Sequence, residues 1–333
     1  MPVEVSFPVP VAYFFLVLFL SFMSASIKQS KVIDFFGEKI LGEKNSRKAI
    51  LMLIALSYLL SPFFLSFVLI TYFRNWILRF EEKAKTLTLL ILSTLIGSII
   101  TPFGNLQNVF IVLAFGNGKP GISISSFVSI MLPLWVSGFF ALVLISYFIS
   151  KGEEIKNIRK SVKIRKKELV FSIILFLFIL GYFNIGRQYN FNLLGLIIIG
   201  GIFSLVFMGM ETLKAVNWEL LIPVGISFVF YYLFKYLPIG IFNVNPFIIY
   251  SIGVLGASGF SSNVLAFILP FLSRNVSFIL YSISVGSIAS VFGCYELILL
   301  FIRTKEEKIN KVLLFGVFMV FLVISILLLF GRR

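Results

Sequence analysis

Hydrophobic residues run along the chain in long stretches that short polar loops separate. The apolar segments cover residues 10–27, 48–73, 86–115, 126–149, 168–185, 191–210, 218–237, 246–272, 276–302 and 312–330. Each is about eighteen residues long or longer, the length that a helix needs to cross a bilayer. The pattern predicts an all-α polytopic protein of the cell membrane, with 10–27 retained as a first span.

Composition narrows the class of protein. Of 333 residues, 59% are hydrophobic and 13% charged, and mean hydropathy is +1.05, far above the range of soluble domains. The chain has no histidine and one cysteine, Cys294, which exclude histidine relays, catalytic triads with histidine and an internal disulfide. We therefore expect neither an enzyme nor a metal centre.

Lysine and arginine predict the topology. The loops at 28–48, 74–85, 151–168 and 303–311 carry six, four, eight and four of them, and the other loops one each. Basic loops stay in the cytoplasm. All four can do so only if 48–73 and 246–272 each enter and leave on one side. The prediction is about eight spans plus two re-entrant hairpins, with both termini outside.

Local sequence fits such hairpins. Pro62 lies at the centre of the first hairpin and removes a backbone donor, while the second centres on the small, polar stretch Gly256–Asn263. Between the first two apolar segments, Lys28–Arg47 has apolar residues on one face. That spacing predicts an amphipathic helix at the membrane surface.

The most unusual stretch is Gly97–Ile111, in the middle of an apolar segment. Pro102 and Gly104 disfavour a continuous helix there, and the amides of Asn105, Gln107 and Asn108 follow at a depth where lipid cannot bond them. A helix broken around an ion or substrate site explains this pattern. A proline-kinked helix whose amides bond neighbouring helices is the alternative.

A second copy of this stretch occurs in the other half of the chain. Gly97–Gln107 aligns with Gly286–Glu296, with Gly, Ser, Ile, Phe and Gly identical. Each copy follows a predicted hairpin, and the two run in opposite directions across the membrane. We interpret 1–150 and 211–333 as inverted repeats around a midplane site, joined by a basic loop and linking helices at 151–210.

The motif TPFGNLQN at 101–108 resembles the signature of the ion-transporter superfamily, in the branch of arsenite pumps and citrate transporters. Three stretches, Ser262–Pro270, Val216–Leu221 and Leu59–Leu65, are similar to other family motifs, although Ser61-Pro62 replaces an Asn-containing pair of the first hairpin. The resemblance implies a transport domain of two hairpins and two broken helices on a scaffold that usually dimerises. It implies alternating access for inorganic oxyanions, arsenite or carboxylates.

These observations predict a secondary active transporter of a small anion, coupled to sodium or protons, that forms a homodimer. A passive channel or a non-transporting scaffold of the same fold is the alternative, given the altered first hairpin. The net charge of +15 lies mostly in short loops, so it predicts topology and not nucleic-acid binding.

The candidate binding residues lie at the breaks and hairpin tips, where half-helix ends and freed backbone groups can hold an anion or sodium. They are Thr101, Gly104, Asn105, Gln107, Asn108, Ser262, Asn263, Ser290 and Gly293. For any single serine or threonine, a bond to its own helix is the alternative.

Glu296 is the one carboxylate predicted well inside a span. Because a buried acid is costly unless it is protonated or paired, Glu296 is a candidate proton carrier. Pairing with Arg303 nearer the cytoplasmic interface is the alternative.

Overall fold

The computed structural model describes residues 9–42, 46–77, 79–116, 121–150, 161–185, 221–236, 245–289 and 309–331, with isolated positions between 200 and 218. Every regular element within these ranges that is longer than a single residue is helical. Five helices are long and apolar enough to cross a membrane: Val9–Ser30, Lys83–Ile100, Ile124–Ile149, Lys166–Asn184 and Lys311–Phe330. The chain is thus a helical membrane protein. Most of the predicted span 191–210 and the second half of 276–302 lie outside the described residues.

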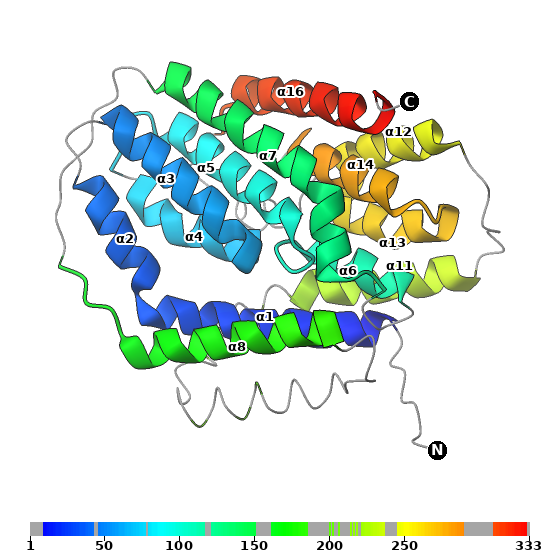
Figure 1. The fold of residues 1–333 in the computed structure, drawn as a ribbon, viewed down its shortest axis with the longest axis horizontal. Coiled ribbons are helices and arrows are strands. Elements are labelled where there is room, and N and C mark those ends of the chain that lie inside the picture. The colour runs from blue at the N-terminus through cyan, green and yellow to red at the C-terminus, as the bar shows by residue number, and fades with distance from the viewer. Residues whose placement is uncertain are drawn as a thin grey trace.

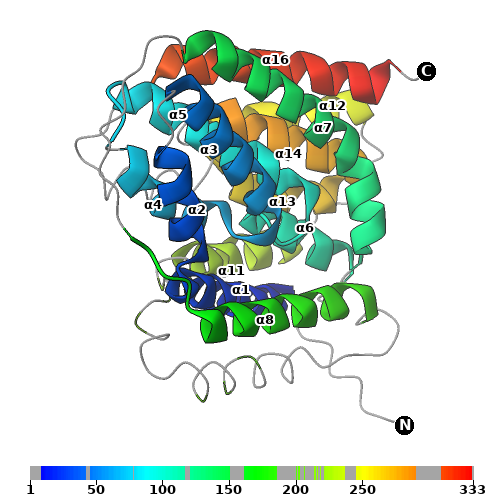
Figure 2. The same cartoon turned by 60° about the vertical axis from the view of Figure 1, so that its left-hand side comes forward.

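One edge of the molecule consists of α1 (Val9–Ser30) and α8 (Lys166–Ile185), which lie side by side in both views (Figures 1 and 2). Helix α11 (Leu221–Tyr236) also packs on α1. After α1 the chain turns at Lys31, whose φ of 54° is left-handed, into α2 (Val32–Leu41). A helix is present within the stretch Lys28–Arg47 where the sequence predicts one, but it is shorter because α1 continues to Ser30 and the turn follows.

The opposite edge consists of α7 (Ile124–Ile149) and α16 (Lys311–Phe330) (Figure 1). Both present large apolar side chains outward, with Phe148 70% exposed and Val312 83% exposed. Exposing such apolar faces to water would cost free energy. Lipid tails are equally apolar and solvate these side chains without that cost. The exposed faces therefore fit a bilayer as solvent.

Helices α3 (Ser46–Leu60) and α4 (Ser66–Ile77) are joined through the short 3-10 helix η1 (Ser61–Phe63). The chain turns back at η1, so that the start of α3 and the end of α4 lie toward the same side of the molecule (Figure 1). Both pack on α5 (Lys83–Gly97), and α2 contacts both. The proline at the centre of the predicted first hairpin is where the helix ends.

A second helical hairpin follows the same plan, with α12 (Pro246–Gly256) and α13 (Ser262–Leu272) joined by the π-helical turn η4 (Ala257–Ser261) and followed by α14 (Val276–Ala289). A Cβ placed on Gly256 would lie 2.9 Å from Leu265, and one on Gly253 3.2 Å from Leu269. Such contacts require α12 and α13 to run antiparallel. At about 1.5 Å per residue, neither helix spans the roughly 30 Å of a bilayer core.

The two hairpins pack on α5 and α14 through matching pairs of small residues. In the first half, Ser57 bonds Ser93 side chain to side chain, and one turn further Gly97 lies directly against Tyr58 and Ser61. In the second half, Gly253 lies against Ser282, and one turn further Gly286 lies against Val254 and Ala257. At Gly97 and Gly286, the aligned glycines of the repeat, a Cβ would overlap the facing backbone.

Candidate functional site

The predicted interruption near Pro102 is present. Helix α5 ends at Gly97, the 3-10 helix η2 (Ser98–Ile100) follows, and α6 (Leu106–Phe115) begins after extended backbone at Thr101 and Asn105. All residues from Ser98 to Leu113 are buried. An irregular backbone is therefore enclosed by protein in the middle of an apolar bundle, the arrangement that membranes tolerate.

The first hairpin provides partners for this irregular backbone. Ser66, the first residue of α4, donates its backbone N–H to the carbonyl of Gly104 at 3.2 Å. Thr101 Oγ1 donates to the carbonyl of Pro62 at 2.6 Å, and Asn108 Nδ2 donates to the carbonyl of Thr101 at 3.1 Å. The break and the hairpin tip thus form one hydrogen-bonded unit.

Oxygen atoms gather around the hydroxyl of Ser66. Its Oγ bonds Asn105 Oδ1, and it lies 3.3 Å from the carbonyl of Gly104 and 3.4 Å from Ser98 Oγ. One hydroxyl proton cannot satisfy three acceptors at once. The cluster is therefore richer in oxygen lone pairs than its own donors can use.

The second hairpin reaches the same region. Ser262 Oγ donates to Gln107 Oε1 at 3.0 Å, joining residues 155 positions apart. Asn263 follows Ser262 at the start of α13 and is only 4% exposed. The tip of the second hairpin therefore meets the first turn of α6.

Four buried amide atoms in this region have no hydrogen-bond partner among the described residues: Asn105 Nδ2, Asn108 Oδ1, Asn263 Nδ2 and Asn263 Oδ1. Native proteins satisfy almost all such atoms, because each orphan costs about 1–3 kcal/mol. A ligand that accepts and donates hydrogen bonds would satisfy them.

Electrostatics at this site come from helix ends. Helices α4 and α6 begin at Ser66 and Leu106 after non-helical backbone, whereas α13 continues directly from the π-helical turn η4, and the bonds described above connect these three elements. N-termini carry partial positive charge and free N–H groups. Segments 59–73, 86–115 and 257–272 contain no Asp, Glu, Lys or Arg. Nor does the described part of the chain group three His, Cys, Asp or Glu residues as a metal site would require.

Seven of the nine predicted binding residues lie on these linked elements, namely Thr101, Gly104, Asn105, Gln107, Asn108, Ser262 and Asn263. Ser290, Gly293 and the proton-carrier candidate Glu296 lie outside the described residues. Ser66 and Ser98 also lie at this site and are not among the residues predicted from the sequence. Ser66 could have been identified from the sequence. It follows the turn Ser61-Pro62 of the first hairpin, and Ser262 has a comparable position after the first residues of the second hairpin tip.

The chain matches no protein-family model and no curated protein sequence. The resemblance to the ion-transporter superfamily rests on the motifs themselves.

Proposed function

We propose that this protein is a secondary active transporter that carries a small anion, either an inorganic oxyanion, arsenite or a carboxylate, by alternating access. The observation that carries the proposal is the set of unpartnered buried amide atoms of Asn105, Asn108 and Asn263. These residues lie on elements that the Gln107–Ser262 bond joins. Buried polar atoms without a partner in an apolar bundle support a ligand site, because a bound ligand would supply the missing hydrogen bonds.

An anion suits the chemistry of this site. The N-terminus of α6 offers backbone N–H groups, and Asn105 Nδ2 and Asn263 Nδ2 are free donors among the described residues. These neutral donors bind negative charge without a buried lysine or arginine. Such a site can release its anion, since no fixed full charge of opposite sign holds it.

A sodium ion suits the neighbouring oxygen cluster. Hydroxyl, amide and carbonyl oxygens of Ser66, Ser98, Gly104 and Asn105 converge there, and hard cations prefer oxygen ligands. Proton coupling through Glu296 is the alternative that the sequence argument raised.

Inverted repeats would give the two hairpins equivalent roles. The paired contacts of Ser93 and Gly97 on α5 and of Ser282 and Gly286 on α14 support this interpretation. So does the opposite orientation of the hairpins, whose ends lie at opposite sides of the molecule (Figure 1). Re-entrant hairpins that meet at the midplane would allow each to gate the site from one side.

Counterflow in proteoliposomes tests the proposal. The reconstituted chain is loaded with phosphate, sulfate, arsenite, citrate or succinate, and uptake of the labelled form is followed with a sodium gradient, a proton gradient or neither. We expect saturable exchange of one class, stimulated by one gradient. Absence of exchange for every member of the panel would overturn the proposal, and a steady voltage-driven conductance would favour a passive channel.

A further inference from the structure

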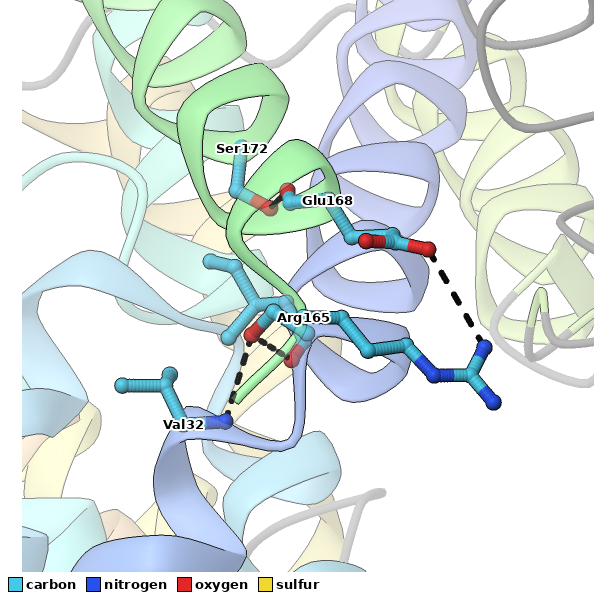
Figure 3. A network of polar contacts seen from close by, with 6 residues as sticks. Val32, Arg165, Glu168 and Ser172 are labelled. Atoms are coloured by element: carbon cyan, nitrogen blue, oxygen red, sulfur yellow. Dashed lines mark hydrogen bonds and ion pairs between the residues drawn. The ribbon is translucent and has the colours of Figure 1, made fainter. Parts of the chain in front are cut away.

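Two basic stretches that lie far apart in the sequence meet at the turn between α1 and α2. The backbone N–H of Arg165 donates to the carbonyl of Ser30 at 2.9 Å, which holds the segment before α8 against this turn. Figure 3 shows Arg165 beside Val32, the first residue of α2. We name the exposed residues there the basic corner: Lys31, Lys163, Arg165, Lys166 and Lys167.

The turn that forms the basic corner is a built feature. Lys31 adopts a left-handed backbone, which is unusual for a residue with a side chain. Ser30 holds the turn, because its Oγ donates to the carbonyl of Ile27 at 2.6 Å and accepts from the N–H of Val32 at 3.3 Å. The lysine is therefore fixed next to Arg165.

Acidic residues offset only part of this charge. Glu168 Oε1 lies 4.0 Å from Arg165 Nη1, and the Arg165 side chain remains 50% exposed (Figure 3). Asp34, on α2, is about half buried and faces Lys31 and Lys28. Among the residues that the structure describes here, five cations against two carboxylates leave a positive surface.

An exposed aromatic pair adjoins the basic corner. Phe35 and Phe36 are 39% and 46% exposed, with ring centroids 5.7 Å apart, while Ile33 and Ile40 on the other face of α2 are buried. Aromatic rings next to lysines are typical of helices at the headgroup level of a membrane.

We propose that the basic corner and the Phe35–Phe36 pair bind the headgroups of anionic phospholipids. The expected depth of the basic corner in the membrane supports lipid as the partner. Helices α1 and α8 are both long enough to cross a bilayer, and the basic corner lies where α1 ends and α8 begins. Its charge complements a leaflet of phosphatidylglycerol or phosphatidylserine. This inference is independent of what the protein transports.

Lipid retention tests it. The full chain is placed in nanodiscs of mixed phosphatidylcholine and phosphatidylglycerol, and the lipids that remain bound are counted by native mass spectrometry. The test variant carries Lys31→Gln, Lys163→Gln, Lys166→Gln and Lys167→Gln. We expect wild type to retain phosphatidylglycerol preferentially and the variant to lose that preference by about fivefold or more, since each basic contact near a charged leaflet contributes about that factor.

A matched control separates this site from the general attraction of basic loops to anionic lipid. Lys83→Gln with Lys311→Gln removes two exposed lysines from other helix starts, and it is compared with Lys31→Gln plus Lys166→Gln, which removes the same charge from the basic corner; the control should leave the preference nearly unchanged. Equal loss in both variants, or no preference in wild type, would overturn the proposal. If the fourfold variant fails to insert, Lys166→Gln alone is compared with Lys83→Gln alone; an equal effect of these two changes is again contrary to the proposal.

Discussion

Asparagine side chains at the candidate site affect both the free energy of unfolding and the proposed binding of the ligand. Asn105 and Asn263 bury amide nitrogens that bond nothing among the described residues, whereas Asn108 uses its Nδ2 to bond the carbonyl of Thr101. An orphan polar atom lowers the free energy of unfolding, and a bonded one raises it. These three asparagines therefore differ in what their removal should do.

We predict that Asn263→Leu raises the thermal midpoint of the detergent-solubilised protein and abolishes anion exchange. Leucine has a similar volume and removes two buried orphan atoms, each of which costs about 1–3 kcal/mol. Asn108→Leu is the matched change: it removes one orphan oxygen but also deletes the Nδ2 bond and leaves the carbonyl of Thr101 without this donor, so its midpoint should lie below that of Asn263→Leu. A variant Asn263→Leu that transports normally would show that this residue lies outside the binding site.

Asp34 gives a prediction for pH. Burial, followed by repulsion from Glu38, raises the pKa of its carboxyl above the ordinary 3.8, against the opposing effect of Lys31 and Lys28. The folded state then binds the proton more tightly than the unfolded state, so this residue lowers stability as pH rises from 3.8 through the raised pKa. Asp34→Asn should raise the thermal midpoint at neutral pH and leave it unchanged in strong acid. Equal midpoints at neutral pH would contradict the burial argument.

At the level of elements, close packing of small residues holds each hairpin on the following helix. Gly97 and Gly286 occupy matching positions, and at each a Cβ would overlap backbone atoms of the facing helix. Backbone cannot move aside as the end of a flexible side chain can. The two contacts should therefore respond alike to the same substitution.

We predict that Gly97→Ala and Gly286→Ala each destabilise the protein, by about 1–3 kcal/mol, because a buried methyl forces the helices apart. Gly259→Ala is the control, since a Cβ at Gly259 meets nothing within 4 Å. Denaturation in mixed micelles measures all three. If only one of the two glycines is sensitive, the matched packing does not reflect equivalent roles.

At the scale of the whole molecule, most of the charged ends of the described helices lie on one side, with Lys235 at the end of α11 as an exception. The end of α1, the starts of α5 and α8 and the start of α16 lie toward one side of Figure 1, and the starts of α7 and α12 toward the other. Lys28, Lys83, Lys166 and Lys311 mark the first group of ends. This agrees with the sidedness that the basic loops predict.

Single cysteines test that sidedness. In a Cys294→Ser background, a cysteine at Lys39 or Lys167 should react with an impermeant maleimide from the cytoplasmic face only. One at Ser125 or Arg274 should react from the outer face only. All four positions are exposed. Labelling of Lys39→Cys and Arg274→Cys from the same face would contradict the topology.

The sequence alone determines those features that depend on local chemistry. The long apolar runs determine a helical membrane protein, because every buried backbone group in lipid must bond within its own segment. Pro62 and Pro102 lie close after the ends of α3 and α5 and disfavour continuation of those helices, since proline lacks the N–H that a helix uses.

Which of these local features contact one another depends on the three-dimensional packing of the chain. The bond from Ser262 to Gln107 and the oxygen cluster at Ser66 depend on how two hairpins and a broken helix pack in three dimensions. A contact across 155 residues leaves no trace in local propensity, because it is selected by the shape of the whole bundle. The same holds for the basic corner, where Arg165 reaches Ser30 only because α8 folds back along α1.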